Sequence, residues 1–295
     1  MLKPSPFFRR SLCLLLAVFL PLSFLPRAHA AEPECIGGEG SGIINILLIG
    51  QDLQEDDICR SDSMILCTFC PETTTITLTS FLRDLYVPIP GKADNRINAA
   101  YASGGSDLLR KTLAETFGVY TDGVIEVDFS QFSGIIDILG GVTIDLRQDE
   151  AEVINRKTGS ALAQGRQLLS GEQALAYSRI RNLDGDGDFS RTARQRNVLT
   201  SLLDSYRNAS ILKVLSAVMD TLPLITTDLE KKEILLLATK LFPFLQDPTV
   251  VSQRLPADGT YTCQRIRGME VLVADMETLR QQLRQSLLPP EETLS

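Results

Sequence analysis

The chain has 295 residues, of which 29 are basic, 37 are acidic and one, His29, is histidine. Residues 1–30 hold four of the basic side chains and no acidic one, so the remainder has 25 basic against 37 acidic residues and a net charge of −12. A protein this acidic is a poor nucleic-acid binder, and we expect no nucleic acid among its partners. Because no histidine follows residue 30, Ser-His-Asp and Cys-His catalysis and histidine-bound zinc are excluded beyond that point.

The first thirty residues are predicted to be a secretion signal. A basic start precedes an apolar run from Leu12 to Leu25, and Ala28-His29-Ala30 provides a small-x-small cleavage site. The run is short for a membrane span and contains Pro21, but an uncleaved membrane anchor is the alternative. In both cases we expect the rest of the chain outside the cytoplasmic membrane, either secreted or membrane-associated through the N-terminus.

Residues 31–42 are rich in Gly, Glu and Ser and predict a linker. From residue 43 onward we expect one large extracytoplasmic domain, with a catalytic core over 43–210 and C-terminal helices and strands over 211–295 that complete it. Strand and helix patterns alternate along it. The predicted fold class is therefore α/β, with a mixed central sheet sandwiched between helices.

The strand predictions start at residues 43–49, a continuous apolar run typical of a strand buried on both faces. Residues 64–69 and 74–80 are β-rich and are joined by Cys70-Pro71-Glu72, which predicts a hairpin. Further strands are predicted at residues 124–127, 142–146, 259–266 and 269–273.

The helix predictions rest on apolar spacing and end signals. Residues 106–117 carry Leu109, Leu113 and Phe117 at i, i+4 and i+8, with Gly118 as the stop. Ser170 and Thr227 each open a capping-box pattern, which predicts a short helix and a helix that runs through Phe242. The remaining helices are predicted at residues 130–139, starting on Ser130, at 191–206, and after Asp275.

Five cysteines lie beyond the signal, at positions 35, 59, 67, 70 and 263. In an exported chain we expect at least one disulfide, involving Cys59 or Cys70, which flank the 64–69 strand. The odd number leaves at least one thiol unpaired within the monomer. The Cys67-x-x-Cys70 spacing lacks the strand-to-helix context of a thioredoxin-like motif.

Five arginines lie within residues 179–196 of this acidic chain. Guanidinium is a planar fork that matches two phosphate oxygens at a time. If residues 177–181 are extended, Arg179 and Arg181 point to one face. The alternative is a solvated turn whose arginines form surface ion pairs with Asp184, Asp186 and Asp188.

The helix predicted to begin at Arg191 extends this basic segment. Ser190 could cap it, and exposed N–H groups at a helix N-terminus favour an anion. Arg191, Arg194 and Gln195 would share one face at i, i+3 and i+4.

Charged residues also follow or precede the early strands. Asp52 follows the first predicted strand, Arg60 and Asp62 precede the second, and Arg83-Asp84 follow the third. Ligand sites of α/β proteins gather at such strand ends. Asp52 and Asp62 could hold Mg²⁺, which favours one or two carboxylates plus phosphate oxygens. The alternative is that both aspartates are turn or capping residues.

In order, these motifs resemble the LytR-CpsA-Psr family over about residues 43–204. The match rests on residues 45–52, 60–64, 83–84, 96–101, 140–142, 169–175, 177–181 and 188–195. Members of this family are extracytoplasmic enzymes that transfer a glycan phosphate from a polyprenyl-diphosphate carrier to a cell-wall acceptor, typically peptidoglycan, using Mg²⁺.

The resemblance implies roles for individual residues. Asp52 and Asp62 would hold the metal, and Asp62 or Asp84 is the candidate general base. The residues implied to line the diphosphate are Arg60, Arg83, Arg179, Arg181, Arg191 and Gln195, and the further motif residues are Asn98, Tyr101 and Arg194.

The resemblance also implies the partners: a polyprenyl-diphosphate-linked glycan, peptidoglycan or another wall acceptor, and the outer face of the cytoplasmic membrane. An apolar trough for the prenyl chain could be formed by Ile135, Ile136 and Leu139 or by residues 235–237, although core packing is the alternative role of both sets. The chain departs from the usual family pattern in a short segment between Asp52 and Asp62, in three cysteines at 59, 67 and 70, and in a cleavable N-terminus. Two other functions stay open: a non-catalytic binder of such lipids or wall glycans, and a secreted pyrophosphatase.

Overall fold

The computed structural model describes residues 36–38, 41–53, 59–185, 187–247 and 249–288, and of residues 52, 53, 59 and 60 it describes only the backbone. The predicted signal or anchor therefore lies outside the described residues. Within the described ranges, no helix is long and apolar enough to cross a membrane.

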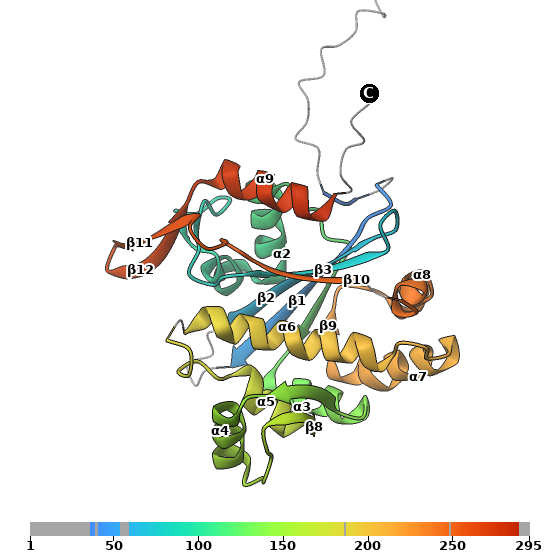
Figure 1. Ribbon diagram of the computed structural model, residues 1–295. Helices are drawn as coiled ribbons and strands as arrows, with labels where there is room; N and C mark the ends of the chain where they lie inside the picture. The colour runs from blue at the N-terminus through green and yellow to red at the C-terminus, as the bar shows by residue number, and fades with distance from the viewer. Residues whose placement is uncertain (1–35, 39–40, 54–58, 186, 248, 289–295) are drawn as a thin grey trace, which may run out of the picture. The chain divides into compact units, whose positions relative to one another are not determined.

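A six-stranded mixed sheet forms the centre, in the order β10-β3-β2-β1-β6-β9 (Figure 1). Strand β1 runs parallel to β6 and antiparallel to β2, and β3 runs antiparallel to β2 and parallel to β10. The ends of β1, β3 and β6 and the start of β2 therefore meet at one edge of the sheet. The strands are β1 Ile44–Leu53, β2 Cys59–Cys70, β3 Thr75–Phe81, β6 Gly123–Val127, β9 Thr226–Thr227 and β10 Thr249–Leu255.

Both faces of the sheet are covered by helices, which confirms the predicted α/β class. In β1, Leu47 and Ile49 pack into the cluster on the side of α2 and α9, whereas Ile46 and Leu48 pack toward the opposite side. Figure 1 shows α2 (Asn98–Phe117) and α9 (Met276–Leu287) on one side of the sheet and α3, α5 and α6 on the other. This two-sided burial explains the apolar run Ile46–Ile49 of β1.

A second cluster builds a layer below the sheet. The antiparallel pair of β7 (Val142–Leu146) and β8 (Gly165–Leu169) packs with α3, α4, α5 and α6, so the predicted 142–146 strand is confirmed but does not join the main sheet. Helix α5 begins after Ser170, whose capping box with Gln173 is confirmed. The helices of this layer are α3 Phe129–Ile138, α4 Gln148–Thr158, α5 Gly171–Ser178 and α6 Asp188–Ser205.

Three predicted helix starts are wrong. Helix α3 is capped by Asp128, which exchanges hydrogen bonds with Gln131, so Ser130 lies inside the helix. Helix α8 (Lys231–Leu241) starts after Glu230, because Thr227 belongs to β9 and pairs with β6. Helix α6 starts at Asp188 rather than Arg191.

Other predictions are confirmed. The 106–117 helix is the second part of α2, which is kinked at Gly104 and Gly105, and Gly118 ends it with a φ of 70°. The 64–80 hairpin is β2 with β3, and the C-terminal strands are β11 (Tyr261–Ile266) and β12 (Met269–Ala274). No sequence pattern predicted β8, β10, α4 or α7 (Ile211–Thr221), or the short strands β4 (Tyr86–Val87) and β5 (Asn95–Arg96).

The packed structure begins before the predicted first strand. Ile36, which falls in the predicted linker, is buried and bridges to Val119. The Asn45 amide donates to the carbonyls of Ile36 and Tyr120 at 2.9 and 2.8 Å and accepts from the Thr68 hydroxyl at 2.7 Å. This fully hydrogen-bonded buried amide fixes the incoming segment to β1.

Three cysteines are described and all are free: Cys67 and Cys70 are buried and Cys263 is exposed. A disulfide through Cys70 is therefore wrong. Cys35 and the side chain of Cys59 lie outside the described residues. Burial raises the pKa of the Cys67 thiol to about 12, so it is an inert core residue.

Candidate functional site

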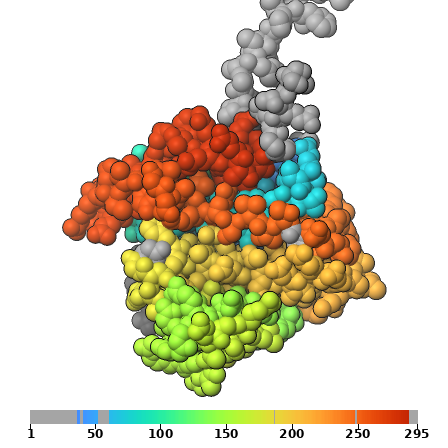
Figure 2. Space-filling view, viewed as in Figure 1, coloured from blue at the N-terminus to red at the C-terminus, as the bar shows by residue number. Residues whose placement is uncertain are grey.

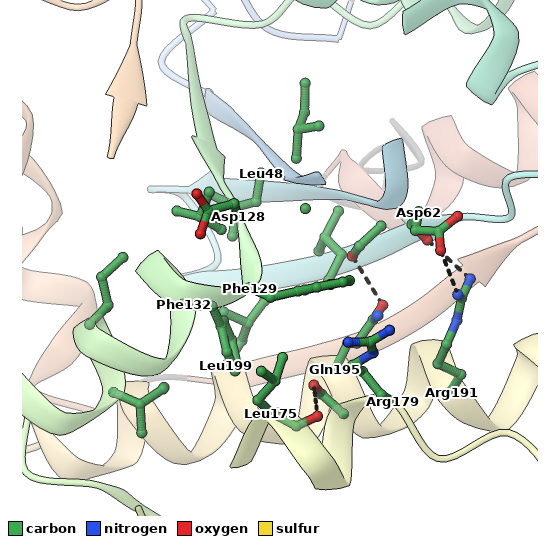
Figure 3. A pocket seen from close by; sticks show the side chains of 18 of the residues that line it. Leu48, Asp62, Asp128, Phe129, Phe132, Leu175, Arg179, Arg191, Gln195 and Leu199 are labelled. Carbon is green, nitrogen blue, oxygen red and sulfur yellow. Dashed lines mark hydrogen bonds and ion pairs between the residues drawn. The ribbon is translucent and has the colours of Figure 1, made fainter. Parts of the chain in front are cut away.

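A cavity of about 830 Å³ lies between the sheet and helices α3, α5 and α6. Figure 3 shows its two parts: apolar side chains, including Leu48, Phe132 and Leu199, gather at one end, and Asp62 with Arg191 stands at the other. The charged end coincides with the sheet edge where β1, β3 and β6 end. The cavity is of the size that small-molecule sites in proteins commonly have.

Strand pairing delivers Asp62 and Ser63 to this edge. The sequence placed residues 60–63 in a loop, but β1 continues to Leu53 and β2 starts at Cys59, so Arg60 and Asp62 lie within paired strands. The register shifts between Gly50 and Gln51. An added Cβ at Gly50 would stand 3.0 Å from the Ser63 Cβ, so the close approach of the two strands favours glycine here.

Three arginines surround the Asp62 carboxylate. Arg83 Nη1 lies 2.8 Å from Asp62 Oδ1, while Arg181 Nη2 and Arg191 Nη1 lie 3.2 and 3.5 Å from Oδ2. Burial alone would raise the pKa of Asp62, but the hydrogen bond from Arg83 and the charges of the three arginines outweigh it and lower that pKa. Asp62 is therefore ionised at neutral pH.

Asp188 is the second carboxylate of this centre. Its carboxylate oxygens lie 2.7 Å from Arg83 Nε, 3.0 Å from Arg191 Nη2 and 3.6 Å from Arg181 Nε. Asp188 was predicted as a surface ion-pair partner and as the first residue of the 188–195 motif, with no role in the site. Its position three residues before Arg191, in the first turn of a helix, was the available signal. Asp62 and Asp188 thus hold three guanidinium groups together at one end of the cavity.

The neighbouring turn adds a second acid and base. Asp84 Oδ1 lies 3.1 Å from Arg96 Nη1, and Asp84 Oδ2 lies 3.6 Å from Arg83 Nε. Arg96 lines the cavity together with Asn98, yet no role for Arg96 was predicted. Within the described part of the chain, Asp84 does not line the cavity itself.

Helix α6 contributes Arg191 and Gln195 from one face. The Arg191 side chain is only 3% exposed, and its Nη2 donates to the backbone oxygen of Asp62 at 3.0 Å. Burial, opposed by Asp188, lowers the pKa of Arg191 to about 10, which leaves it charged at neutral pH. One turn further, Gln195 Oε1 accepts a hydrogen bond from the Ser63 hydroxyl at 3.0 Å. Gly187, with a φ of 57°, occupies the N-cap of α6 and offers no side-chain cap.

Arg179 reaches the cavity by a different route from the predicted one. Residues 177–181 are not extended, because α5 includes Tyr177 and Ser178 and ends at Arg179. The Arg179 guanidinium stacks on the Phe129 ring, 4.0 Å from its centroid (Figure 3), and among the described residues it forms no ion pair. Lys157, which the sequence analysis missed, lines the same cavity. Burial and the charge of Arg179 lower the pKa of Lys157.

Two motif residues lie outside the described cavity lining. Arg194 is buried on the other face of α6, where it donates to Glu150 at 2.8 Å and pairs with Asp184. Its predicted common face with Arg191 and Gln195 is therefore wrong, and its role is to fix α6 to α4 and the 181–187 loop. Tyr101 donates its hydroxyl to Glu126 and accepts from Gln51, which braces the ends of β1 and β6.

The predicted residues therefore divide into three sets. The structure brings Asp62, Arg83, Asn98, Arg179, Arg181, Arg191 and Gln195 to one cavity. Asp84 stands beside the arginine centre, and Tyr101 and Arg194 brace its surroundings. The side chains of Asp52 and Arg60 lie outside the described residues, although their backbones pair with each other in the β1–β2 ladder.

The apolar end is built mainly by two helices and the sheet. Ile135 and Ile136, two of the predicted trough residues, line it, whereas Leu139 and residues 235–237 do not. Its other walls are formed by Leu48, Ile65, Ile125, Phe129, Phe132, Leu175, Leu199 and Leu202. A cavity that is arginine-rich at one end and apolar at the other suits an amphiphile with an anionic head group.

Within the described residues no group of three His, Cys, Asp or Glu side chains stands ready to hold a metal. Asp62 is ionised and reaches the cavity, and Mg²⁺ needs only one or two protein carboxylates when phosphate oxygens and water complete its shell. The described part of the site is therefore compatible with Mg²⁺ bound together with a phosphate ligand.

The fold and site define an α/β protein with an anion- and lipid-type cavity, and comparison with known proteins places it in a family. The LytR_cpsA_psr family model matches residues 27–286, so the chain belongs to the LytR-CpsA-Psr family. The polyisoprenyl-teichoic acid–peptidoglycan teichoic acid transferase TagU of Oceanobacillus iheyensis is 35% identical over 203 residues, which cover 66% of this chain and 62% of TagU. This chain thus spans about three fifths of the length of that relative.

Two further proteins are similar. The regulatory protein MsrR of Staphylococcus aureus is 36% identical over 166 residues, which cover 56% of this chain and 49% of MsrR. The solved structure of the family protein YwtF (TagT) of Bacillus subtilis with bound octaprenyl pyrophosphate shares 27% identity and has a TM-score of 0.65. That match covers 86% of this chain and 95% of the solved chain.

Proposed function

We propose that this protein is an extracytoplasmic phosphotransferase that moves a glycan phosphate from a polyprenyl-diphosphate carrier to a cell-wall acceptor such as peptidoglycan. The observation that carries the proposal is the two-ended cavity: arginines at one end and an apolar compartment at the other match a diphosphate head and a prenyl tail. The names of two relatives support it, since TagU is a teichoic acid transferase and YwtF (TagT) was solved with octaprenyl pyrophosphate.

The arginines would change partners when the diphosphate arrives. Without it, Asp62 and Asp188 form ion pairs with the guanidinium groups of Arg83, Arg181 and Arg191. A diphosphate brings more negative charge than either carboxylate and matches the same forks. We infer that the carboxylates keep the three arginines positioned for the substrate, which lowers the cost of assembling the site.

The transfer step follows from this arrangement. An acceptor hydroxyl oxygen attacks the glycan-side phosphorus, the bond from that phosphorus to the bridging oxygen breaks, and polyprenyl phosphate leaves. The arginines stabilise the charge that develops on the transferred phosphoryl group and on the leaving phosphate. Arg179, between the apolar side chains and the Asp62–Arg191 pair in Figure 3, is placed for the phosphate nearest the prenyl tail.

The proton acceptor in this proposal is Asp62 or Asp84. Asp62 lines the cavity, and Arg83, Arg181 and Arg191 keep it ionised and able to accept a proton. Asp84 lies beside the arginine centre, where it pairs with Arg96, but outside the described cavity lining. The loose transition state of phosphoryl transfer makes a modest demand on this base.

Mg²⁺ is part of the proposal. Asp62 would hold it together with Asp52, and when bound the ion would neutralise charge on the diphosphate oxygens. The ion and the arginines would compete for the Asp62 carboxylate, because both of its oxygens pair with arginines in the structure. Transfer of those arginines to the diphosphate would free the Asp62 oxygens for the ion.

The test uses the full chain with a short-chain prenyl-diphosphate glycan and purified peptidoglycan. We expect labelled glycan to appear on peptidoglycan with the wild type and to be lost in Arg181→Ala. The matched control is Arg207→Ala, because Arg207 forms ion pairs with Asp204 and Asp247, which are both exposed. Phosphate release without acceptor labelling would favour a pyrophosphatase. Lipid binding without turnover would favour the regulatory alternative, which the name of MsrR suggests.

A further inference from the structure

Helices α7 and α8 are apolar in sequence but bury little. Val214 is the only buried side chain of α7, and α8 has none among its residues. Leu212 is 75% exposed and Leu236 is 56% exposed, whereas most leucines that the structure describes are buried or half-buried. Two neighbouring helices with unburied leucines mark an interaction surface.

Lysines frame these leucines. Lys232, Leu236 and Lys240 follow one another at i, i+4 and i+8 and therefore share one stripe of α8, and Lys213 follows Leu212. Four of the seven lysines beyond residue 35 lie in these two helices. The acidic residues nearby are Asp220, Glu230 and Glu233, of which Glu230 pairs with Lys232 at 2.8 Å. Leucines flanked by long cationic side chains are typical of helices that lie in a membrane interface.

The same helices pack against elements that wall the apolar end of the cavity. Helix α3 carries Phe132 and Ile135 of the cavity wall, and Leu224, just after α7, packs so closely on it that a Cβ at Gly134 would lie 3.1 Å from the leucine Cδ1. Leu237 and Leu241 of α8 belong to the same cluster as Leu199. Figures 1 and 2 show α7 and α8 at the right-hand side of the view, away from the start of α6.

We propose that the exposed surface of α7 and α8, defined by Leu212, Lys213, Lys232, Leu236 and Lys240, rests on a phospholipid bilayer. The proposal rests on the proposed function only in that a prenyl-linked donor resides in a bilayer, next to which the apolar end of the cavity must lie. A bilayer fits better than a second copy of the chain. In a two-fold dimer this surface would face itself and set lysine against lysine.

A single introduced tryptophan reports directly on this contact, because the chain contains no tryptophan. Leu212→Trp and Leu236→Trp are prepared in the full chain, with Val251→Trp as the control, since Val251 is 38% exposed and lies in β10, outside α7 and α8. With vesicles of mixed zwitterionic and anionic phospholipid, we expect the emission of the two α7–α8 tryptophans to shift to shorter wavelength and to be quenched by brominated lipid. The control should show neither change.

The comparison within one full chain separates this contact from any binding through residues 1–30, which are the same in all three variants. Unchanged emission at positions 212 and 236 in vesicle-bound protein would overturn the proposal, as would equal quenching at position 251. A second measurement compares wild type with the double variant Leu212→Ser/Leu236→Ser. We expect transfer from a bilayer-embedded donor to fall about tenfold or more, and transfer from a soluble short-chain donor to change less than about twofold.

The two readouts also separate the two proposals. If the wild type fails to transfer the soluble donor, the transferase function is wrong, but the tryptophan measurement still decides the membrane contact. If the double variant loses both donors equally, the leucines act on the fold or the site and the membrane assignment is wrong.

Discussion

Replacement of Arg181 by lysine should slow glycan transfer strongly without unfolding the protein. Lysine keeps the positive charge but loses the planar fork and is more strongly hydrated. In the structure Arg181 reaches both carboxylates of the centre, Asp62 at 3.2 Å through Nη2 and Asp188 at 3.6 Å through Nε. A lysine carries its donors on one nitrogen and lacks the separate Nε and Nη2 groups through which Arg181 reaches the two carboxylates.

The expected magnitudes differ for activity and stability. If Arg181 binds the diphosphate, loss of one charge-assisted hydrogen bond costs about 1.5–3 kcal/mol. When that hydrogen bond is stronger in the transition state than in the bound substrate, the transfer rate falls roughly tenfold to hundredfold. The Arg181 side chain is 40% exposed and its ion pairs are long. Such pairs contribute less than about 1 kcal/mol to folding, which shifts Tm by no more than about 4 °C.

The assay is the initial rate of transfer from a prenyl-diphosphate donor to peptidoglycan, measured for wild type, Arg181→Lys and Arg181→Ala alongside thermal unfolding. Arg194→Lys is the contrasting variant, because Arg194 is buried with Glu150 and lies outside the cavity lining in the described structure. It should lower the unfolding temperature more than Arg181→Lys does. A lysine variant at position 181 within about twofold of the wild-type rate would show that Arg181 is only a surface ion-pair residue.

Four further outcomes are expected. Asp62→Asn should lower the free energy of unfolding by roughly 1–3 kcal/mol at neutral pH, because it removes a negative charge that pairs with three arginines. Although burial opposes them, these arginines lower the folded-state pKa of Asp62. The stabilisation that ionised Asp62 provides is therefore complete above its unfolded-state pKa of about 4 and is lost as the pH falls below that value. In urea denaturation, the difference in unfolding free energy between wild type and Asp62→Asn should therefore become smaller below about pH 4. Leu199→Asn should weaken binding of prenyl diphosphate about tenfold and leave pyrophosphate binding unchanged in calorimetry, since Leu199 stands at the apolar end of the cavity (Figure 3). Cys263→Ser should remove one rapidly reacting thiol equivalent in a thiol titration of the native protein, whereas Cys67→Ser should remove none, because Cys67 is buried. Asp52→Ala should abolish stimulation of transfer by Mg²⁺, and full activity in the presence of a chelator would contradict the metal assignment.

Local sequence patterns predicted much of the fold. The apolar run of β1, the β2–β3 hairpin and the Ser170 capping box each depend on residues close together in the chain, and each was found where expected. The arginine-rich segment likewise indicated a phosphate-binding centre. These features follow from side-chain chemistry and from the periods of helix and strand, which a sequence displays directly.

Only the tertiary structure decided which charges meet. Arg191 and Arg194 are three residues apart on α6, yet one reaches Asp62 in the cavity and the other Glu150 behind the helix. The helix period places both near one side, and the packing of α6 between the sheet and α4 sets which of them faces the cavity. The role of Asp188 in the centre also depends on tertiary structure, because its partner Arg83 follows β3, far away in the sequence.

The sequence by itself therefore determined the elements of this protein and the chemical types of its site: strands, capped helices, arginines and ionised carboxylates. The tertiary structure decided the pairing of those types, the apolar compartment joined to them and the unburied leucines of α7 and α8. The physical reason is the sequence distance over which each interaction acts. Periodicity and capping act over a few residues, whereas desolvation, ion pairing and cavity formation depend on segments that only the folded sheet brings together.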